Sequence, residues 1–320
     1  MNPYYKDFSE YMGEIFPGVK VQKLSIDAGF TCPNRDGSIG TGGCIYCNNA
    51  SFTPGYCSPK DSVETQILKG KEFFRKKYPE MKYLAYFQSY TNTFGKSVKI
   101  LEEMYRNAIE IEDVVGIIIG TRPDCIPDDL VGALSEINKE KPVIVEIGAE
   151  TSKDETLRLI NRNHTWNDVE DTTKRLNERG IRTGLHLIAG LPEENDEDVL
   201  ASVRKACLLP IDSIKMHQLQ IVKGTPLLSK WEKGEIDVVP FLLKDYLDLC
   251  VRIVKMVPRN ICIERFLASS PPEMVVSPKW GLKNYQFTNL LMNELRCSVA
   301  GIMTTATVNA GLVPMTDIKS

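Results

Sequence analysis

Short apolar runs alternate along the chain with longer segments in which apolar and charged residues recur at helical spacing. The short runs are rich in β-branched, aromatic and aliphatic side chains, which is typical of strands in a buried sheet. They predict six strands, at residues 21–26, 83–88, 115–121, 143–147, 182–188 and 213–220. The periodic segments predict helices at residues 62–77, 97–109, 128–138, 154–160, 166–179 and 197–208.

The order of these elements predicts the class of fold. Several predicted helices begin after Asp, Ser or Asn and end near Gly or Pro, the residues that favour helix ends. Repeated alternation of strand and helix favours a parallel sheet with right-handed crossovers. Six such units fall short of the eight that close a full barrel. We therefore expect an α/β fold, a partial, open (β/α)6 TIM-like barrel with its functional residues at the C-terminal ends of the strands.

The last part of the chain follows a different pattern. It predicts one amphipathic helix, a strand at residues 261–266 and a further helix at residues 284–295. We expect two domains: a core at residues 1–243, and a small C-terminal α/β extension at residues 244–320 that completes it. The tail after Leu295 is expected to be loosely ordered.

Composition and charge limit where the protein works. The chain has 320 residues, of which 25% are charged, so it can bury a substantial core. No run reaches the roughly 18 apolar residues of a membrane span, and "MNPYYKDFSE" lacks the pattern of a signal peptide. We expect a soluble cytoplasmic protein with no membrane partner. The net charge of −3 gives no global signature of nucleic-acid binding, although a local basic face stays open.

Three of the nine cysteines gather in the stretch "CPNRDGSIGTGGCIYC". Cys32, Cys44 and Cys47 have the spacing C-x11-C-x2-C, and the gap holds glycines that let a backbone wrap closely around a compact object. The stretch follows the first predicted strand, so it belongs at a strand's C-terminal end. The scattered cysteines are interpreted as small buried apolar residues rather than a disulfide framework.

Three thiolates without a fourth ligand favour catalysis over structure. Structural zinc usually takes four protein ligands, and the histidines of this chain, His164, His186 and His217, all lie far downstream of the cysteines. An iron–sulfur cube also presents four metal corners. Three cysteines would leave one iron free to bind another molecule. The alternative from a different class is a non-catalytic zinc or iron–sulfur protein with a structural or binding role.

The cysteine stretch resembles the cluster loop of the radical S-adenosylmethionine (SAM) superfamily, in which three cysteines hold a [4Fe–4S] cluster and SAM binds the fourth iron. Tyr46 matches the aromatic residue typical just before the last cysteine. The usual spacing in the superfamily is C-x3-C-x2-C. The longer gap of this chain resembles that of the YhcC/YtqA-type branch, which is related to the radical SAM portion of Elongator subunit three. Further matching stretches extend to about residue 295: "YFQSYTNTF", "GTRPDC", "EIGAET", "NRNHT", "HLIAGLP", "KMHQLQ" and "SPKWGLK".

The resemblance implies SAM-binding residues after the predicted strands. Relatives carry a Gly-rich loop for the methionine amine after the second strand, where this chain has Gln88, Ser89, Tyr90 and Thr91. An ordinary polar loop explains these four residues as well.

Glu150 and Arg162 correspond to a Gln and an Arg near SAM in coproporphyrinogen-dehydrogenase-like relatives. By that resemblance Glu150 would contact the ribose or the methionine part, and the planar guanidinium of Arg162 would pair with the carboxylate. A surface ion pair is the alternative interpretation. Glu146 is an alternative to Glu150, but it can also lie inside the barrel.

Histidines and a lysine end the later strands. His186 stands where relatives often have an Asp that binds the ribose hydroxyls, which a neutral imidazole can also do; it can instead be a core histidine. Lys215 and His217 share one face of the sixth strand and suggest either a polar substrate or a buried hydrogen-bond network. Cys125 ends "GTRPDC" and is either a hydrogen-atom donor or a packed thiol. The catalytic residue is thus undecided among Cys125, Lys215 and His217.

The resemblance also implies a reaction and its partners. A reduced [4Fe–4S] cluster would cleave SAM to a 5′-deoxyadenosyl radical that abstracts hydrogen from a substrate, in an oxidoreductase or transferase type of reaction. The electron would come from a donor of the flavodoxin or ferredoxin type. The branch suggests a tRNA wobble-uridine side chain as the substrate (tRNA modification). A basic run with Phe73 and Phe74 in the helix at residues 62–77 fits tRNA, but a solvated amphipathic helix explains it equally well.

Overall fold

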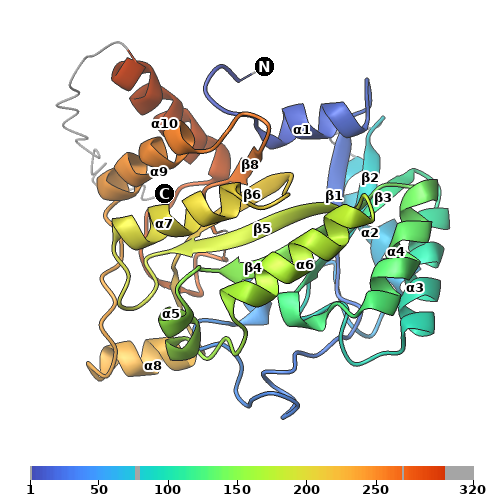
Figure 1. Ribbon diagram of the computed structural model, residues 1–320, viewed down its shortest axis with the longest axis horizontal. Helices are drawn as coiled ribbons and strands as arrows, with labels where there is room; N and C mark the ends of the chain where they lie inside the picture. Colours follow the sequence, from blue (N-terminus) through green and yellow to red (C-terminus); the bar gives the residue numbers. More distant parts are fainter. Residues whose placement is uncertain (1, 76–79, 269, 300–320) are drawn as a thin grey trace, which may run out of the picture.

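The structure is a computed structural model that describes residues 2–75, 80–268 and 270–299. Seven parallel strands form one curled sheet in the order β1-β2-β3-β4-β5-β6-β8 (Figure 1). The strands are β1 (Val21–Ile26), β2 (Lys82–Phe87), β3 (Val114–Thr121), β4 (Val143–Glu150), β5 (Arg182–Ala189), β6 (Ser213–Gln218) and β8 (Cys262–Arg265). The predicted partial, open barrel is therefore confirmed.

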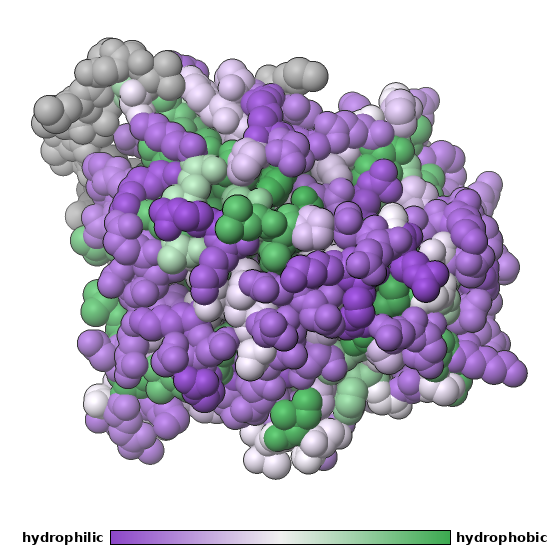
Figure 2. Space-filling model, in the orientation of Figure 1, coloured by the Kyte–Doolittle hydropathy of each residue, from purple (hydrophilic) through white to green (hydrophobic). Residues whose placement is uncertain are grey.

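Helices cover the outer face of this sheet (Figure 1). Helix α5 (Asp154–Leu159) is not one of them, because its Leu157 belongs to a smaller apolar cluster with Ile45 and Leu191. The covering helices are α2 (Val63–Arg75), α3 (Val98–Glu110), α4 (Asp128–Glu140), α6 (Trp166–Glu178), α7 (Asp196–Cys207) and α9 (Leu243–Met256), with α10 (Asn284–Val299) packed on α9. Their apolar faces pack on outward-facing strand residues such as Leu24, Phe87 and Val145 in the main core. Their other faces are largely hydrophilic, as the face in Figure 2 shows. Among the described helices, none is both long and apolar enough to cross a membrane.

Strand side chains that alternate with this core point into the barrel. At the N-terminal end of the strands, Leu84 and Ile118 pack against Met12 and Phe16 in a separate apolar cluster. Met12 belongs to α1 (Phe8–Ile15), which begins after Asp7, whose carboxylate caps the helix by accepting from the backbone N–H of Glu10. Helix α1 thus closes the bottom of the barrel. The sequence did not predict it.

The C-terminal part contributes directly to the sheet. Strand β8 matches the predicted strand at residues 261–266 and pairs in parallel with β6. A small antiparallel pair, β7 (Ile221–Val222) and β9 (Val275–Ser277), and helix α8 (Pro226–Glu232) were not predicted. Strand β6 ends two residues earlier than expected. The domain boundary after residue 243 stays a prediction, and residues 300–320 of the expected loose tail lie outside the described residues.

Candidate cofactor and active site

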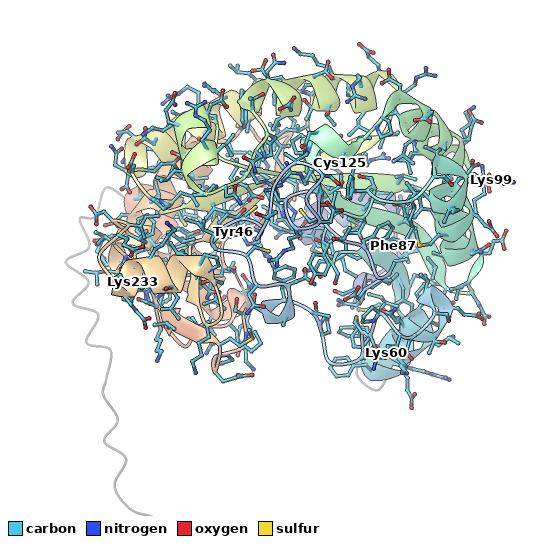
Figure 3. The ribbon with its side chains drawn as sticks, turned by 90° about the horizontal axis from the view of Figure 1, so that it is seen from below. Tyr46, Lys60, Phe87, Lys99, Cys125 and Lys233 are labelled. Carbon is cyan, nitrogen blue, oxygen red and sulfur yellow. The ribbon has the colours of Figure 1, made fainter. Side chains whose placement is uncertain are left out.

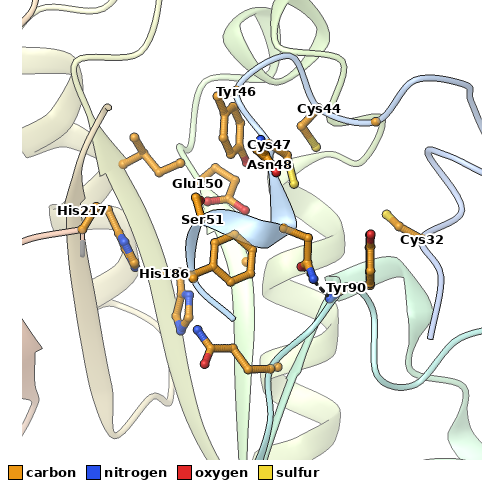
Figure 4. A pocket seen from close by; sticks show the side chains of 18 of the residues that line it. Cys32, Cys44, Tyr46, Cys47, Asn48, Ser51, Tyr90, Glu150, His186 and His217 are labelled. Atoms are coloured by element: carbon orange, nitrogen blue, oxygen red, sulfur yellow. Dashed lines mark hydrogen bonds between the residues drawn. The ribbon is translucent and has the colours of Figure 1, made fainter. Parts of the chain in front are cut away.

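A cavity of about 260 Å³ opens at the C-terminal ends of the strands (Figure 4). The residues that line it come from the loop after β1, from the ends of β2 to β6, and from β8. Parallel strands carry their functional residues at this edge in barrel folds. The cavity therefore lies where the sequence placed the working residues.

All three clustered cysteines line this cavity (Figure 4). The thiols of Cys32 and Cys44 are buried, that of Cys47 is half-buried, and all three are free. Their loop is held by its own backbone, because the N–H of Arg35 donates to Cys32 O at 2.8 Å and that of Cys47 to Cys44 O at 3.0 Å. At Gly43 φ is +79°, and a Cβ there would lie 2.8 Å from Arg35 Nε. The glycines therefore permit the tight path that the sequence suggested.

Two hydrogen-bond donors lie near the sulfur of Cys44. Asn34 Nδ2 lies 3.6 Å from Cys44 Sγ, and Arg162 Nη1 lies 3.8 Å from the same atom. Burial, followed by the neighbouring Cys44, raises the pKa of the Cys47 thiol to about 11. A metal bound to the Cys47 sulfur would favour its thiolate form near neutral pH.

Glu150 and Arg162 form the ion pair that the sequence suggested, but it is buried in the cavity wall rather than exposed. Arg162 Nη2 lies 3.3 Å from Glu150 Oε1 and donates to Gly148 O at 2.7 Å. Glu150 has φ of +65°, next to the point where the register between β4 and β5 shifts. A non-glycine residue held in the left-handed region is often part of a functional site.

The four residues after β2 divide between two sides of the chain. Gln88, Tyr90 and Thr91 line the cavity, and Tyr90 also has a positive φ, of +62°. Ser89 does not line it: this buried side chain has its hydroxyl 3.4 Å from that of Thr53. Three of the four residues are thus near enough to contact a bound molecule.

Cys125 is the last residue of a short 3-10 helix, Pro123–Cys125, that follows β3 (Figure 3), and it does not line the cavity. Its thiol is buried 3.8 Å from Asp124 Oδ1, and burial, followed by that carboxylate, raises the pKa of Cys125 to about 12. This placement fits the packed-thiol interpretation better than the hydrogen-atom donor.

A network of charged side chains forms the floor of the cavity. Glu146 Oε2 accepts from His186 Nε2 at 2.7 Å, from the Tyr86 hydroxyl at 2.7 Å and from Lys215 Nζ at 2.6 Å. Burial alone would raise the pKa of Glu146, but Lys215 and Lys23 outweigh it and hold the pKa well below its usual range. Glu146 therefore lies inside the barrel, as the alternative interpretation held.

The two candidate histidines line the cavity, and Lys215 lies beneath it. The His186 and His217 rings are 5.3 Å apart between centroids. The buried network is present, which supports the interpretation as a hydrogen-bond network. The two imidazoles line the cavity, which supports the interpretation as a site for a polar substrate.

Sequence reasoning missed several cavity residues: Arg35, Tyr86, Arg122 and Arg265. Arg122 stood in the quoted stretch "GTRPDC", where only Cys125 was weighed. It is almost fully buried and pairs with Asp124 through two hydrogen bonds of 2.9 and 2.8 Å. An arginine and an aspartate two positions apart, directly after a predicted strand, were the sequence signal that could have identified it.

The sequence profile of the Radical SAM superfamily matches residues 35–206, more than half of the chain. The chain belongs to the radical SAM superfamily. Residues 211–296 match the Radical SAM C-terminal domain. Membership implies an enzyme that uses a [4Fe–4S] cluster and SAM, and it does not favour the structural zinc protein.

Relatives of this radical SAM protein confirm the branch that the cysteine spacing suggested. YtqA of Bacillus subtilis is 35% identical over 91% of this chain and 89% of its own length. YhcC of Escherichia coli K12 is 37% identical over 82% of this chain and 83% of its own length. A tRNA uridine(34) acetyltransferase of Methanocaldococcus infernus is more distant, at 23% identity over 75% of this chain and 45% of that protein.

A solved structure confirms the fold. Elp3 of Methanocaldococcus infernus, with an N-terminal deletion, superposes with a TM-score of 0.64 over 89% of this chain at 15% identity. The match spans 64% of the Elp3 chain. The likeness at this identity concerns the fold alone.

Proposed function

We propose that Cys32, Cys44 and Cys47 hold a [4Fe–4S] cluster with one iron left for SAM, and that the protein is a radical SAM enzyme acting on a bound substrate. The observation that carries the proposal is that three free thiols line one cavity at the C-terminal edge of the barrel. Structural zinc usually takes four protein ligands, whereas three cysteines can hold a cluster that leaves one iron open, so the three thiols suit a cluster better than a zinc ion.

When bound, the cluster and SAM supply reductive cleavage of the sulfonium bond and a 5′-deoxyadenosyl radical. The chain's own residues bind and orient. Arg162 presents a guanidinium beside Cys44 for the SAM carboxylate, and its buried Nε has no hydrogen-bond partner among the residues described. Glu150, fixed beside it, is proposed to contact the ribose or the methionine part.

The remaining contacts to SAM come from the second and fifth strands. Backbone and side-chain groups at Gln88, Tyr90 and Thr91 face the cavity and are proposed to receive the methionine amine. His186 is proposed to reach the ribose hydroxyls. Burial, followed by Lys215, lowers the pKa of His186, so its imidazole is neutral and can act as a hydrogen-bond partner.

Metal analysis of anaerobically reconstituted protein tests the cluster assignment. The wild-type protein should carry about four iron and four sulfide per chain, and its electron paramagnetic resonance signal after reduction should change when SAM is added. Replacement of Cys32, Cys44 or Cys47 by Ala should abolish this iron and sulfide. Cys57→Ala is the matched control, because the Cys57 thiol donates to Ser25 O at 2.9 Å and does not line the cavity. Zinc without sulfide in the wild-type protein would refute the assignment.

We further propose tRNA as the substrate, with modification of a wobble-uridine side chain, and a flavodoxin- or ferredoxin-type electron donor. The support is the name of the distant relative, a tRNA uridine(34) acetyltransferase. The basic helix α2 adds little, because Lys69 pairs with Asp61 at 2.7 Å and Lys71 with Asp113 at 3.1 Å. Residues 76 and 77 of that run lie outside the described residues.

Salt dependence of tRNA binding tests this substrate. If phosphates are contacted, the logarithm of the binding constant should fall linearly with the logarithm of salt concentration. Transfer RNA from a deletion strain should also lack one modified nucleoside. A flat salt response together with unchanged nucleosides would contradict a tRNA substrate and leave the cluster chemistry untouched.

A further inference from the structure

Four charged side chains form a closed ring of ion pairs beneath the cavity. Lys23 Nζ lies 2.7 Å from Glu146 Oε1 and 2.8 Å from Glu264 Oε1. Lys215 Nζ lies 2.6 Å from Glu146 Oε2 and 3.0 Å from Glu264 Oε1. All four side chains are at most 14% exposed. Two ammonium groups and two carboxylates balance one another, so the ring as a whole carries no net charge.

The protonation states in the ring follow from its geometry. Burial raises the pKa of Glu264, but Lys215 and Lys23 outweigh burial and lower it, as they do for Glu146. The pKa of Lys215 is lowered, because burial outweighs the opposing effect of Glu146 and Glu264. Two contacts of 2.6 and 3.0 Å to ionised carboxylates are the geometry of a charged ammonium.

Arg265 lies directly beside this ring but outside its charge balance. It is the register partner of Lys215 across β6 and β8, and its side chain lines the cavity. Within the described chain no carboxylate forms an ion pair with it, and its one hydrogen-bond contact is Nη2 to His217 Nδ1 at 3.4 Å. Its Nε is buried and has no hydrogen-bond partner in the part of the chain that the structure describes. Among the described residues, no ion pair therefore compensates the positive charge of Arg265 in the cavity wall.

His217 adds a second unpaired donor at the same place. Burial, followed by Arg265, holds the pKa of His217 well below its usual range, so the imidazole is neutral. Because Nδ1 faces an arginine donor, it acts as the acceptor, and we assign the proton to Nε2. This Nε2 is buried and has no partner among the described residues. The N–H of His217 Nε2 and the guanidinium of Arg265 can therefore both donate to one bound acceptor.

We propose that Arg265 and His217 bind an anionic group of the substrate, a carboxylate or a phosphate, inside the barrel. Buried N–H groups without a hydrogen-bond partner are costly, so an anion bound to Arg265 Nε and His217 Nε2 would stabilise this arrangement. The fork of an arginine matches the paired oxygens of both groups. His217 lies across the pocket from Cys32 and Cys44 (Figure 4), whereas Arg162 lies beside Cys44. The anion is therefore a group of a second molecule rather than the carboxylate of SAM.

Calorimetric titration of the reconstituted protein with small anions tests this site. SAM is bound beforehand, because it keeps these anions away from the open iron. Inorganic phosphate and acetate are titrated separately at constant ionic strength, and the tighter of the two identifies the kind of group. We expect one anion per chain, with an affinity that falls about 10-fold or more in Arg265→Gln, through the loss of a charge-assisted contact. Arg265→Lys should retain part of the affinity. Arg296→Gln, an exposed change on α10, should leave it unchanged.

Thermal unfolding in buffer without oxyanions separates this role from a structural one. Arg265 is half-buried and pairs with no carboxylate of the described chain, so its removal should leave the melting temperature of Arg265→Gln equal to or above that of the wild type. Three results would overturn the proposal. They are a lower melting temperature of Arg265→Gln, phosphate and acetate affinities of this variant equal to those of the wild type, and no anion binding by the wild type. The assignment of this anion site to the substrate rests on the proposed function. Formation of 5′-deoxyadenosine by the wild type tests that function in a separate assay, so the anion site and the proposed function can each fail alone.

Discussion

At the scale of single residues, the candidate SAM site depends on a glycine that admits a close contact. Arg162 Nη2 donates to Gly148 O while it pairs with Glu150. A Cβ at Gly148 would lie 2.5 Å from Arg162 Nη2 and 2.7 Å from Glu150 Oε1. Any side chain at this position must displace the ion pair in the cavity wall.

Gly148→Ala should therefore weaken SAM binding by about 10-fold or more, because the guanidinium loses its charge-assisted geometry. Overpacking should also lower the free energy of unfolding by about 1–3 kcal/mol. Equilibrium binding of SAM and urea denaturation measure the two effects. Gly132→Ala in α4 is the control: its Cβ would meet no atom within 4 Å, and it should raise stability by about 0.5–1 kcal/mol. Equal SAM affinity in Gly148→Ala and the wild type would contradict this role of Arg162.

The three thiols that line the cavity could be identified from one stretch of the sequence, whereas other cavity residues could not. The spacing of Cys32, Cys44 and Cys47 is a local property, so a single stretch was enough. A SAM contact for Ser89 stays a prediction, but its side chain does not line the cavity, whereas that of its neighbour Gln88 does. Arg265 depends on a pairing between β6 and β8, which no local pattern reveals.

At the scale of elements, helix α1 closes the barrel end opposite the candidate site. Its Tyr11 and Met12, with Phe16 just beyond it, pack on inward-facing strand residues, which are apolar there and charged nearer the cavity. The helix was missed because eight residues span too few turns for a clear helical period. The longer strands β3, β4 and β5 were found because buried parallel strands read as continuous apolar runs.

Met12→Ala should lower the free energy of unfolding by about 2–5 kcal/mol, since Met12 is 4% exposed and its loss leaves a cavity under the barrel. Ser9→Ala, an exposed change on the same helix, should stay within about 0.5 kcal/mol of the wild type. Urea denaturation compares the two. Indistinguishable stabilities would show that α1 is not part of the folded barrel's core.

At the scale of the whole molecule, burial keeps all three histidines of the chain neutral. Burial, followed by Arg162, lowers the pKa of His164 to about 2, and the pKa values of His186 and His217 are also lowered. The unfolded chain binds these protons as the pH falls below about 6.5, whereas the folded chain does not. The stability that depends on them is therefore present above that pH and lost below it.

The free energy of unfolding should accordingly fall between pH 6.5 and 5, by up to about 1.4 kcal/mol per pH unit for each histidine that stays neutral. Glu146 and Glu264 have lowered pKa values, so they add a further loss only below about pH 4.5. Urea denaturation at several pH values measures the slope. His164→Gln should reduce it, and a stability that does not change from pH 7 to 5 would contradict the neutral histidines.

The overall architecture followed from the sequence because strand–helix alternation has few parallel solutions. The alternation accounts for β1 to β6 and their helices. It did not show that β8, after α8 and α9, returns to the edge of the same sheet, since that contact joins segments distant along the chain. This return is what brings Glu264 and Arg265 into the barrel interior.

The central claim is that the three thiols of one loop support cleavage of SAM, and 5′-deoxyadenosine is its direct product. Protein reconstituted with iron and sulfide without oxygen is reduced with dithionite, given SAM, and assayed by chromatography. The account predicts 5′-deoxyadenosine from the wild type and from Cys57→Ala, and none from Cys44→Ala. Formation of the product by Cys44→Ala at the wild-type rate, or its absence from wild-type protein with an intact cluster, would contradict the account.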